Sequence, residues 1–75
     1  MAEIQRQPVS SSDIASIGYE ATTETLEIEF KATGVYRYFS VPKNVWEELA
    51  RTPSPGKLFL QHIKGKYAWE KIGRD

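Results

Sequence analysis

The stretch TLEIEFKATGVYRYFSVP, residues 25–42, decides the fold because apolar and charged side chains alternate along it. In its first half, Leu26, Ile28 and Phe30 alternate with charged residues, which predicts a strand with one buried and one solvated face. The letters ATG follow as a short loop, in which Gly34 can adopt a positive φ. VYRYFSV then returns as the partner strand, so the stretch predicts a β-hairpin.

Two tyrosines share one face of the returning strand, and the hairpin register decides whether that face is buried. An odd-numbered loop makes one face apolar and aromatic and leaves a charge pair on the other; the pairs are Phe30 with Tyr36, Ile28 with Tyr38, and Glu29 with Arg37. An even-numbered loop places Phe30 opposite Arg37, which is chemically less consistent. We therefore expect Tyr36 and Tyr38 mainly in the core, and the alternative is a surface on which nucleobases stack.

Two helices are predicted after the hairpin. Pro42 has no N–H for strand pairing and suits the first turn of a helix, and PKNVWEELART carries an apolar stripe. The letters TPSP mark the end of that helix. A second helix follows, with Ser54 as its N-cap, Pro55 as its first residue and Gly65 as its closing glycine.

The flanking segments complete the predicted domain. Residues 1–8 are polar, contain Pro8 and show no periodicity, which predicts a flexible arm. A short strand is expected over residues 16–21, and the tail KYAWEKIGRD is expected to fold back over the core. Residues 9–75 are therefore predicted to form one α+β domain, a small antiparallel sheet of two to three strands followed by two helices packed on one face.

The composition indicates a small globular domain. A chain of 75 residues buries only about 60% of the surface that it exposes when unfolded, so a homodimer is a reasonable expectation. No apolar run is long enough to cross a membrane, and the N-terminal residues lack the apolar core of a signal peptide. The absence of cysteine favours the cytoplasm, and we expect no membrane association.

Charge is unevenly distributed although the net charge is zero. Residues 1–37 carry six carboxylates against three basic side chains, whereas residues 49–69 contain no carboxylate. The second helix begins in this acid-free window, where unpaired backbone N–H groups and the helix dipole favour an anion. We therefore predict a nucleic-acid-binding surface, with an ordinary capped helix and solvated lysines as the alternative; the predicted residues are Arg51, Ser54, Gly56, Lys57, Lys64 and Lys66.

Catalytic and metal-binding groups are scarce. His62 is the only histidine, and the chain has no cysteine that could share a metal with it. The serines at residues 10–12 have no evident base beside them, so turn hydrogen bonds are expected of them. We expect no enzyme activity, no cofactor and no metal site.

The order of short motifs along the chain resembles the KTSC domain family. The motifs cover residues 9–67 and read SSSDIASIGYE, LEIEF, GVYRYFSVP, VWEEL and SPGKLFLQHIKGKY. Tyr36 and Tyr38 match the Tyr-x-Tyr at the centre of the family pattern, whereas Leu60 stands where that pattern has an asparagine. The resemblance implies a domain that occurs alone in bacterial proteins and at the C-terminus of some lysyl-tRNA synthetases.

Attachment to an enzyme that handles tRNA implies a nucleic acid ligand, with RNA ahead of DNA. We therefore expect a non-catalytic nucleic-acid-binding module. The alternative is a protein–protein interaction or dimerisation module with no nucleic acid ligand. Salt separates the two, because phosphate contacts weaken steeply as salt rises and an apolar interface hardly responds.

Overall fold

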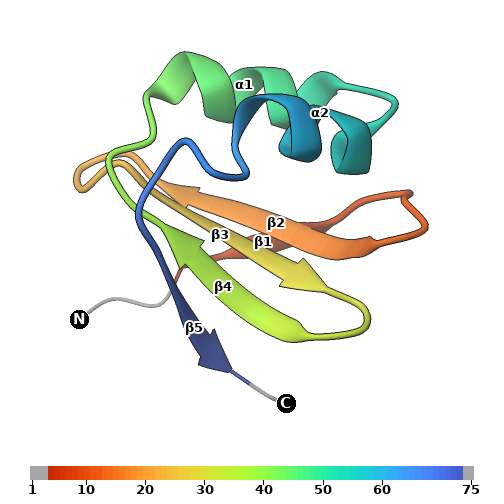
Figure 1. The fold of residues 1–75 in the computed structure, drawn as a ribbon. Helices are drawn as coiled ribbons and strands as arrows, with labels where there is room; N and C mark the ends of the chain where they lie inside the picture. Colours follow the sequence, from red (N-terminus) through yellow and green to blue (C-terminus); the bar gives the residue numbers. More distant parts are fainter. Residues whose placement is uncertain (1–3, 74–75) are drawn as a thin grey trace.

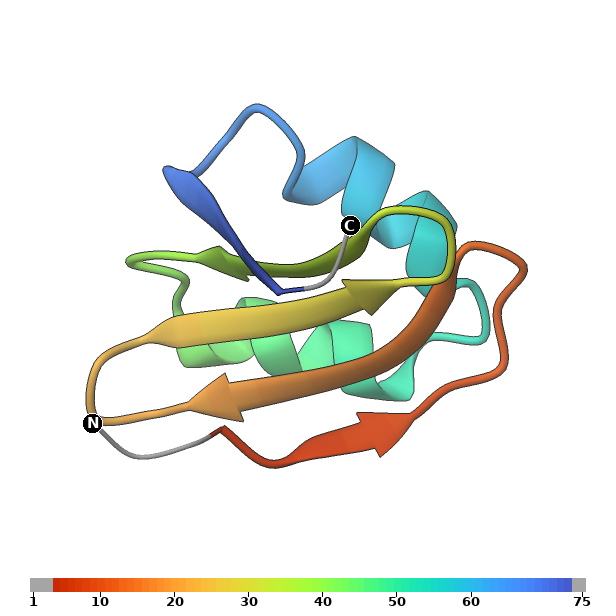
Figure 2. The same cartoon turned by 90° about the horizontal axis from the view of Figure 1, so that it is seen from below.

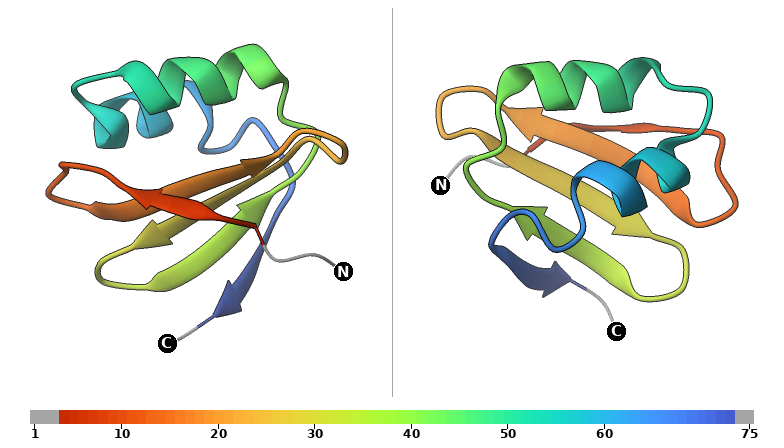
Figure 3. Two further views of the ribbon diagram at one scale, coloured as in Figure 1. Left: turned by 180° about the vertical axis from the view of Figure 1, so that it is seen from behind. Right: turned by 45° about the horizontal axis from the view of Figure 1, so that its top comes forward.

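Five antiparallel strands form one sheet in chain order, and two helices cover one of its faces (Figure 1). The computed structural model describes residues 4–73. The elements are β1 (Arg6–Pro8), β2 (Ile14–Glu20), β3 (Thr25–Phe30), β4 (Gly34–Tyr38), α1 (Lys43–Arg51), α2 (Pro55–His62) and β5 (Trp69–Gly73). Figure 3 shows from two further sides that both helices lie on the same face.

The predicted strand count of two to three is wrong, because both ends of the chain add a strand to the sheet. Arg6–Pro8 pair with β2, where a flexible arm over residues 1–8 was expected, and residues 1–3 lie outside the described residues. Pro8 is compatible with this position because an edge strand has one side without ladder hydrogen bonds. Trp69–Gly73 run along β4 instead of folding back over the core. The α+β class and the placement of the two helices after the hairpin hold.

The central hairpin has the predicted faces but a register shifted by two residues. Its loop contains three residues, 31–33, and Gly34 starts β4 with a φ of 110°. Because β4 begins at this glycine, Phe30 pairs with Gly34 rather than with Tyr36. The tyrosines therefore lie opposite apolar residues nearer the start of β3; the pairs are Leu26 with Tyr38, Ile28 with Tyr36, and Glu27 with Arg37.

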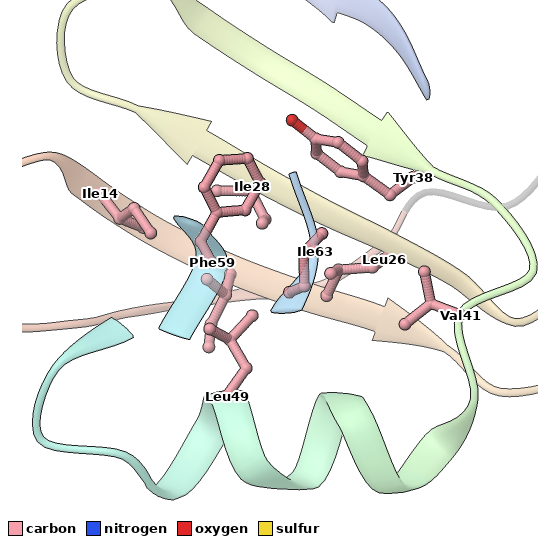
Figure 4. Packing of buried hydrophobic residues seen from close by; sticks show 9 residues of the cluster. Ile14, Leu26, Ile28, Tyr38, Val41, Leu49, Phe59 and Ile63 are labelled. Carbon is pink, nitrogen blue, oxygen red and sulfur yellow. The ribbon is translucent and has the colours of Figure 1, made fainter. Parts of the chain in front are cut away.

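The hydrophobic core lies between the sheet and the two helices (Figure 4). Alternation along the strands supplies its lower layer, and the apolar stripes of the helices supply its upper layer. Seven side chains are less than 2% exposed, and Tyr38 and Phe59 are 6% and 7% exposed. The nine core residues are Ile14, Ile17, Leu26, Ile28, Tyr38, Val41, Leu49, Phe59 and Ile63.

Helix α1 packs against the sheet through an aromatic pair. The rings of Tyr19 on β2 and Trp46 on α1 stack with centroids 5.6 Å apart and planes 7° apart. The Tyr19 hydroxyl donates a 2.6 Å hydrogen bond to the carbonyl oxygen of Val41, just before the helix. Neither helix among residues 4–73 is long and apolar enough to cross a membrane.

Figure 2 looks onto the face of the sheet without helices. An ion network crosses three strands of the sheet on this face. Glu27 on β3 is 3% exposed and accepts from an arginine on either side. Its Oε1 lies 2.9 Å from Nε of Arg37 on β4, and its Oε2 contacts Nη1 of Arg6 on β1. The buried charge is therefore compensated by two cations, and the network links three strands.

Gly18 allows the N-terminal segment to approach β2 closely. A Cβ atom at this position would lie 2.4 Å from the carbonyl oxygen of Gln5 and 2.9 Å from Cγ2 of Ile4. Gly18→Ala is therefore expected to displace β1 and to lower the free energy of unfolding by about 1 kcal/mol. The loss of stability is small because displacement of a short terminal strand leaves the rest of the sheet intact.

Amide hydrogen exchange and urea denaturation of Gly18→Ala check this expectation. Amides of residues 6 and 7 should exchange faster, while those of β3 and β4 keep most of their protection. Gly73→Ala is the matched control, because its Cβ would meet only ordinary contacts at 3.4 and 3.5 Å with Val35. Unchanged exchange at β1 in Gly18→Ala would contradict the close approach.

Candidate nucleic-acid interface

An aromatic groove opens between β4, β5 and the C-terminal end of α2. It has a volume of about 280 Å³. Its lining residues are Phe30, Thr33, Tyr36, Tyr38, Phe59, Lys64, Gly65 and Trp69. Helix α2 ends at His62, and Gly65 turns the chain with a φ of 79°, a conformation that favours glycine. Beside this turn, Tyr36 on β4 is half-buried and Trp69 on β5 is exposed, whereas Tyr38 is buried.

The rings of the groove pack in edge-to-face and tilted arrangements. Phe30 meets Phe59 with centroids 5.0 Å apart, and it meets Tyr36 at 5.6 Å. Tyr36 in turn lies 5.5 Å from Trp69 on the neighbouring strand, with the planes tilted by 55°. Trp69 is 58% exposed, so the series of rings runs from the core to solvent. Such a platform can stack on another planar ring.

The polar side chains of the groove are three hydroxyls, which donate and accept hydrogen bonds, and one ammonium, which only donates; they belong to Thr33, Tyr36, Tyr38 and Lys64. The side chains of Tyr36, Tyr38 and Lys64 have no hydrogen bond or ion pair within residues 4–73. Burial, and secondly the neighbouring Tyr36, raise the pKa of Tyr38 to about 12, so its hydroxyl keeps its proton at neutral pH. Among the described residues that line the groove there is no carboxylate. The groove therefore offers a ligand aromatic rings, hydroxyl groups and one positive charge.

The raised pKa of Tyr38 predicts a loss of stability at alkaline pH. The unfolded chain releases this proton near pH 10, whereas the folded chain holds it to about pH 12. Between these values the folded state binds more protons, so its free energy of unfolding falls as pH rises. Tyr38→Phe should remove this part of the decline, which urea midpoints measured at pH 9 and above would reveal. Parallel declines in both proteins would contradict the assignment.

A second depression, the serine-lined cleft, lies at the N-terminal end of α2. It is formed by residues 10–13 and 53–57 and has a volume of about 450 Å³. Oγ of Ser11 accepts hydrogen bonds of 3.2 Å from the backbone N–H groups of Asp13 and Ile14, which fixes this loop. Nζ of Lys31 donates 2.6 Å to the carbonyl oxygen of Ser11. Three predicted residues, Ser54, Gly56 and Lys57, line this cleft.

The serine-lined cleft already contains a carboxylate at the helix start. Oδ2 of Asp13 and Oγ of Ser11 each lie 3.6 Å from the position that a Cβ of Gly56 would take. Ser54 is the N-cap residue of α2, as predicted, but its side chain makes no capping hydrogen bond. Because Asp13 places a negative charge near the positive end of the helix, the cleft is less favourable to phosphate than the sequence predicts.

The predicted site residues fall into three groups. Tyr36, Tyr38 and Lys64 meet in the aromatic groove, with Tyr38 buried and Tyr36 half-buried. A shallow depression of about 230 Å³ joins the groove to the serine-lined cleft and is lined by Gly56, Leu60 and Lys64 among others. Arg51, at the end of α1, and Lys66, in the turn before β5, are exposed and line neither the groove nor the cleft among the described residues.

Two contributors to these surfaces could not be predicted from the sequence as read. Trp69 reaches the groove because WEKIG pairs with β4, and the alternation in these five residues is too short to identify a strand by itself. Asp13 reaches the start of α2 from a loop more than forty residues earlier in the chain. Within residues 4–73 no group of three or more metal-ligating side chains lies together.

Comparisons with known proteins identify the family of this chain. The model of the KTSC domain matches residues 10–67. A lysine–tRNA ligase of Trichormus variabilis is 48% identical over 61 residues, which are 81% of this chain and 11% of the ligase. An uncharacterized protein of Stutzerimonas stutzeri is 34% identical over 64 residues, 85% of this chain and 90% of that protein. The chain thus spans about a tenth of the ligase and most of the shorter relative.

A solved structure agrees with the computed one. The crystal structure of a KTSC domain protein from Yersinia pestis superposes with a TM-score of 0.92 at 45% sequence identity. The match covers 95% of this chain and 100% of that one. Strand β1 lies before the segment that the family model matches, and β5 lies after it. By sequence and by structure, the chain belongs to the KTSC domain family.

Proposed function

We propose that this domain binds single-stranded nucleic acid without catalysing a reaction, and that RNA is preferred over DNA. The observation that carries the proposal is the aromatic groove, in which an exposed tryptophan, a half-buried tyrosine and Lys64 surround a space of about 280 Å³. Unstacked bases pack on aromatic rings, and a lysine at the rim can contact the adjoining phosphate. Double-stranded ligands are disfavoured because their bases are already stacked.

Lys57 and Lys64 provide the phosphate contacts in this proposal. Lys57 lies in the first turn of α2, and Lys64 lies in the turn that follows the end of the helix at His62. Both are exposed. Arg51 and Lys66 extend the basic surface on either side of this helix. A strand that stacks in the groove can therefore run along α2 with its backbone near two cations.

The preference for RNA rests on the relatives. Three lysine–tRNA ligases contain a segment 44–48% identical to this chain, and an enzyme of that name acts on tRNA. An appended RNA-binding segment would hold tRNA near such an enzyme, and the same surface in a separate chain would bind RNA by the same contacts. Such a function places the protein in the cytoplasm.

A protein-interaction module is the second candidate, and exposed apolar side chains favour it. Leu60, Trp69 and Ile72 are 60%, 58% and 40% exposed. A homodimer or another protein partner could cover Leu60 and Trp69, which border the aromatic groove and its neighbouring depression. Burial of these side chains would give an association that hardly depends on salt.

Charge reversal at Lys57 and Lys64 tests the nucleic acid proposal. Lys57→Glu combined with Lys64→Glu is expected to lower the affinity for a labelled single-stranded RNA by at least about tenfold at low salt, because two phosphate contacts become repulsive. The slope of log affinity against log salt should fall by about two. Fluorescence anisotropy with RNA, single-stranded DNA and duplex DNA at two salt concentrations measures both quantities.

Lys43→Glu is the control for net charge, because Lys43 is exposed at the far end of α1. This substitution should lower the affinity for RNA much less than Lys64→Glu alone does. If the unmodified protein binds none of the three ligands at low salt, or if the double reversal binds as tightly, the protein-interaction candidate replaces this proposal. Sedimentation at high micromolar concentration then shows whether the partner is a second copy.

A further inference from the structure

A second recess lies on the face of the sheet without helices, opposite the face that carries the aromatic groove. It has a volume of about 460 Å³, which is within the range of pockets that bind small molecules. The turn between β2 and β3 borders it on one side, and β5 borders it on the other. We call it the sheet recess, and the residues that define it are Glu20, Thr25, Arg37, Phe39, Glu70 and Ile72.

Strand pairing places the polar members of the recess on one face. Thr25 on β3 lies opposite Glu20 on β2. Arg37 on β4 lies opposite Glu27 on one side and opposite Glu70 on the other. Because Thr25 and Glu27 alternate with the core residues of β3, these side chains point away from the helices.

Two apolar side chains line the sheet recess without belonging to the core. Phe39, directly after β4, is half-buried and has no ring contact with another aromatic side chain within residues 4–73. Ile72 on β5 is 40% exposed. Neither is among the described side chains that pack against the core. Apolar surface that stays open outside the core is typical of a binding site.

Two carboxylates stand on opposite sides of this apolar surface. Glu20 and Glu70 are three strand spacings apart in the sheet, about 14 Å at the backbone. Neither forms an ion pair with any residue from 4 to 73, although the Thr22 hydroxyl donates a 2.6 Å hydrogen bond to Glu20. The charge of Arg37 is compensated by Glu27, whose Oε1 lies 2.9 Å from its Nε. The recess is therefore negative at two separate points.

We propose that the sheet recess binds an aliphatic diamine, with its ammonium groups at Glu20 and Glu70 and its methylene chain over Phe39 and Ile72. Carboxylates form charge-assisted hydrogen bonds with ammonium ions, and an aromatic ring adds a cation–π attraction. A lysine side chain has a single ammonium and would leave one carboxylate without a partner. The recess and the aromatic groove lie on different faces of the sheet, so this inference goes beyond the proposed function and does not depend on it.

Putrescine, n-butylamine and n-butanol test the proposal, because they share one carbon chain and carry two, one and no ammonium groups. Nuclear magnetic resonance titration of isotope-labelled protein at constant ionic strength measures their binding. Putrescine should shift the amides of residues 20–25, 37–39 and 70–72. It should bind about threefold more tightly than n-butylamine, the contribution of one exposed ion pair. The alcohol should cause no saturable shift.

Single substitutions locate the site. Glu20→Gln and Glu70→Gln should each remove the advantage of putrescine over n-butylamine. Glu24→Gln is the matched control, because Glu24 is an exposed carboxylate in the neighbouring turn that does not line the recess. Phe39→Ala should weaken both amines, and it should leave the fold intact because Phe39 lies outside the core.

Four outcomes would overturn the proposal. They are the absence of amide shifts with putrescine, equal affinities of the unmodified protein for the two amines, an unchanged preference in both glutamine variants, and binding only of a peptide that contains one lysine. The last of these would assign the recess to a protein segment. Loss of the preference for putrescine in Glu70→Gln with unchanged affinity for RNA would support a diamine site separate from the aromatic groove.

Discussion

Tyr38→Ala is expected to lower the free energy of unfolding by about 4 kcal/mol, within the range for truncating a large aromatic side chain in a core. Tyr38 is 6% exposed and packs against Phe59 of α2, so its removal leaves a cavity where the sheet meets the helix. The backbone of β4 cannot move inward to fill that space, because the strand is paired with β3 on one side and with β5 on the other. Urea denaturation followed by tryptophan fluorescence measures the loss.

Two comparisons make this result specific. Tyr38→Phe keeps the ring and should cost little, since the hydroxyl makes no hydrogen bond within the described residues. Tyr36→Ala should cost less than Tyr38→Ala, because Tyr36 is only half-buried. A Tyr38→Ala protein that unfolds at the midpoint of the unmodified protein would show that this tyrosine is not part of the core.

Glu27→Gln is expected to cost about 3 kcal/mol, the lower end of the range for removing one partner of a buried ion pair. The substitution keeps the shape of the side chain but leaves Arg6 and Arg37 without their shared negative charge. The two arginine side chains are 31% and 20% exposed, so water screens part of the loss. Denaturant midpoints at low and at high salt would measure it.

Glu29→Gln is the matched control on the same strand and the same face. Glu29 is half-buried and accepts a 2.9 Å hydrogen bond from Oγ of Ser16, which a glutamine oxygen can also accept. Its replacement should therefore cost within about 0.5 kcal/mol. Equal losses for the two glutamates would contradict a specific role for the Glu27 network.

The elements that could be predicted from the sequence are those with strong local signals. The hairpin follows from the alternation around Gly34, and the two helices follow from prolines and apolar stripes. Strands β1 and β5 carry no comparable signal, because RQP has no apolar residue and WEKIG is too short. They become strands only because β2 and β4 offer free edges, which is tertiary context rather than local propensity.

The residue types of the candidate surfaces could be read from the sequence, but the arrangement of those residues in space could not. An acid-free window could be read from the sequence, but the depression at the start of α2 contains Asp13, brought there by the loop before β2. Lys64 meets the two tyrosines because α2 ends beside β4, a relation that depends on the packing angle of the helix. Tyr38 is 6% exposed, whereas Tyr36 is half-buried, and both line the aromatic groove.

The two outer strands have a consequence for chain-to-chain assembly. Pro8 interrupts the outer edge of β1, since it has no N–H to offer a further strand. Two copies of β5 could pair with each other in an antiparallel arrangement. If all five residues pair, Lys71 lies opposite Lys71 of the other copy. If the centre of the pairing moves by one residue, Glu70 lies opposite Glu70. Like charges directly across a ladder repel. Both edge strands of the sheet therefore disfavour edge-to-edge pairing between copies of this domain.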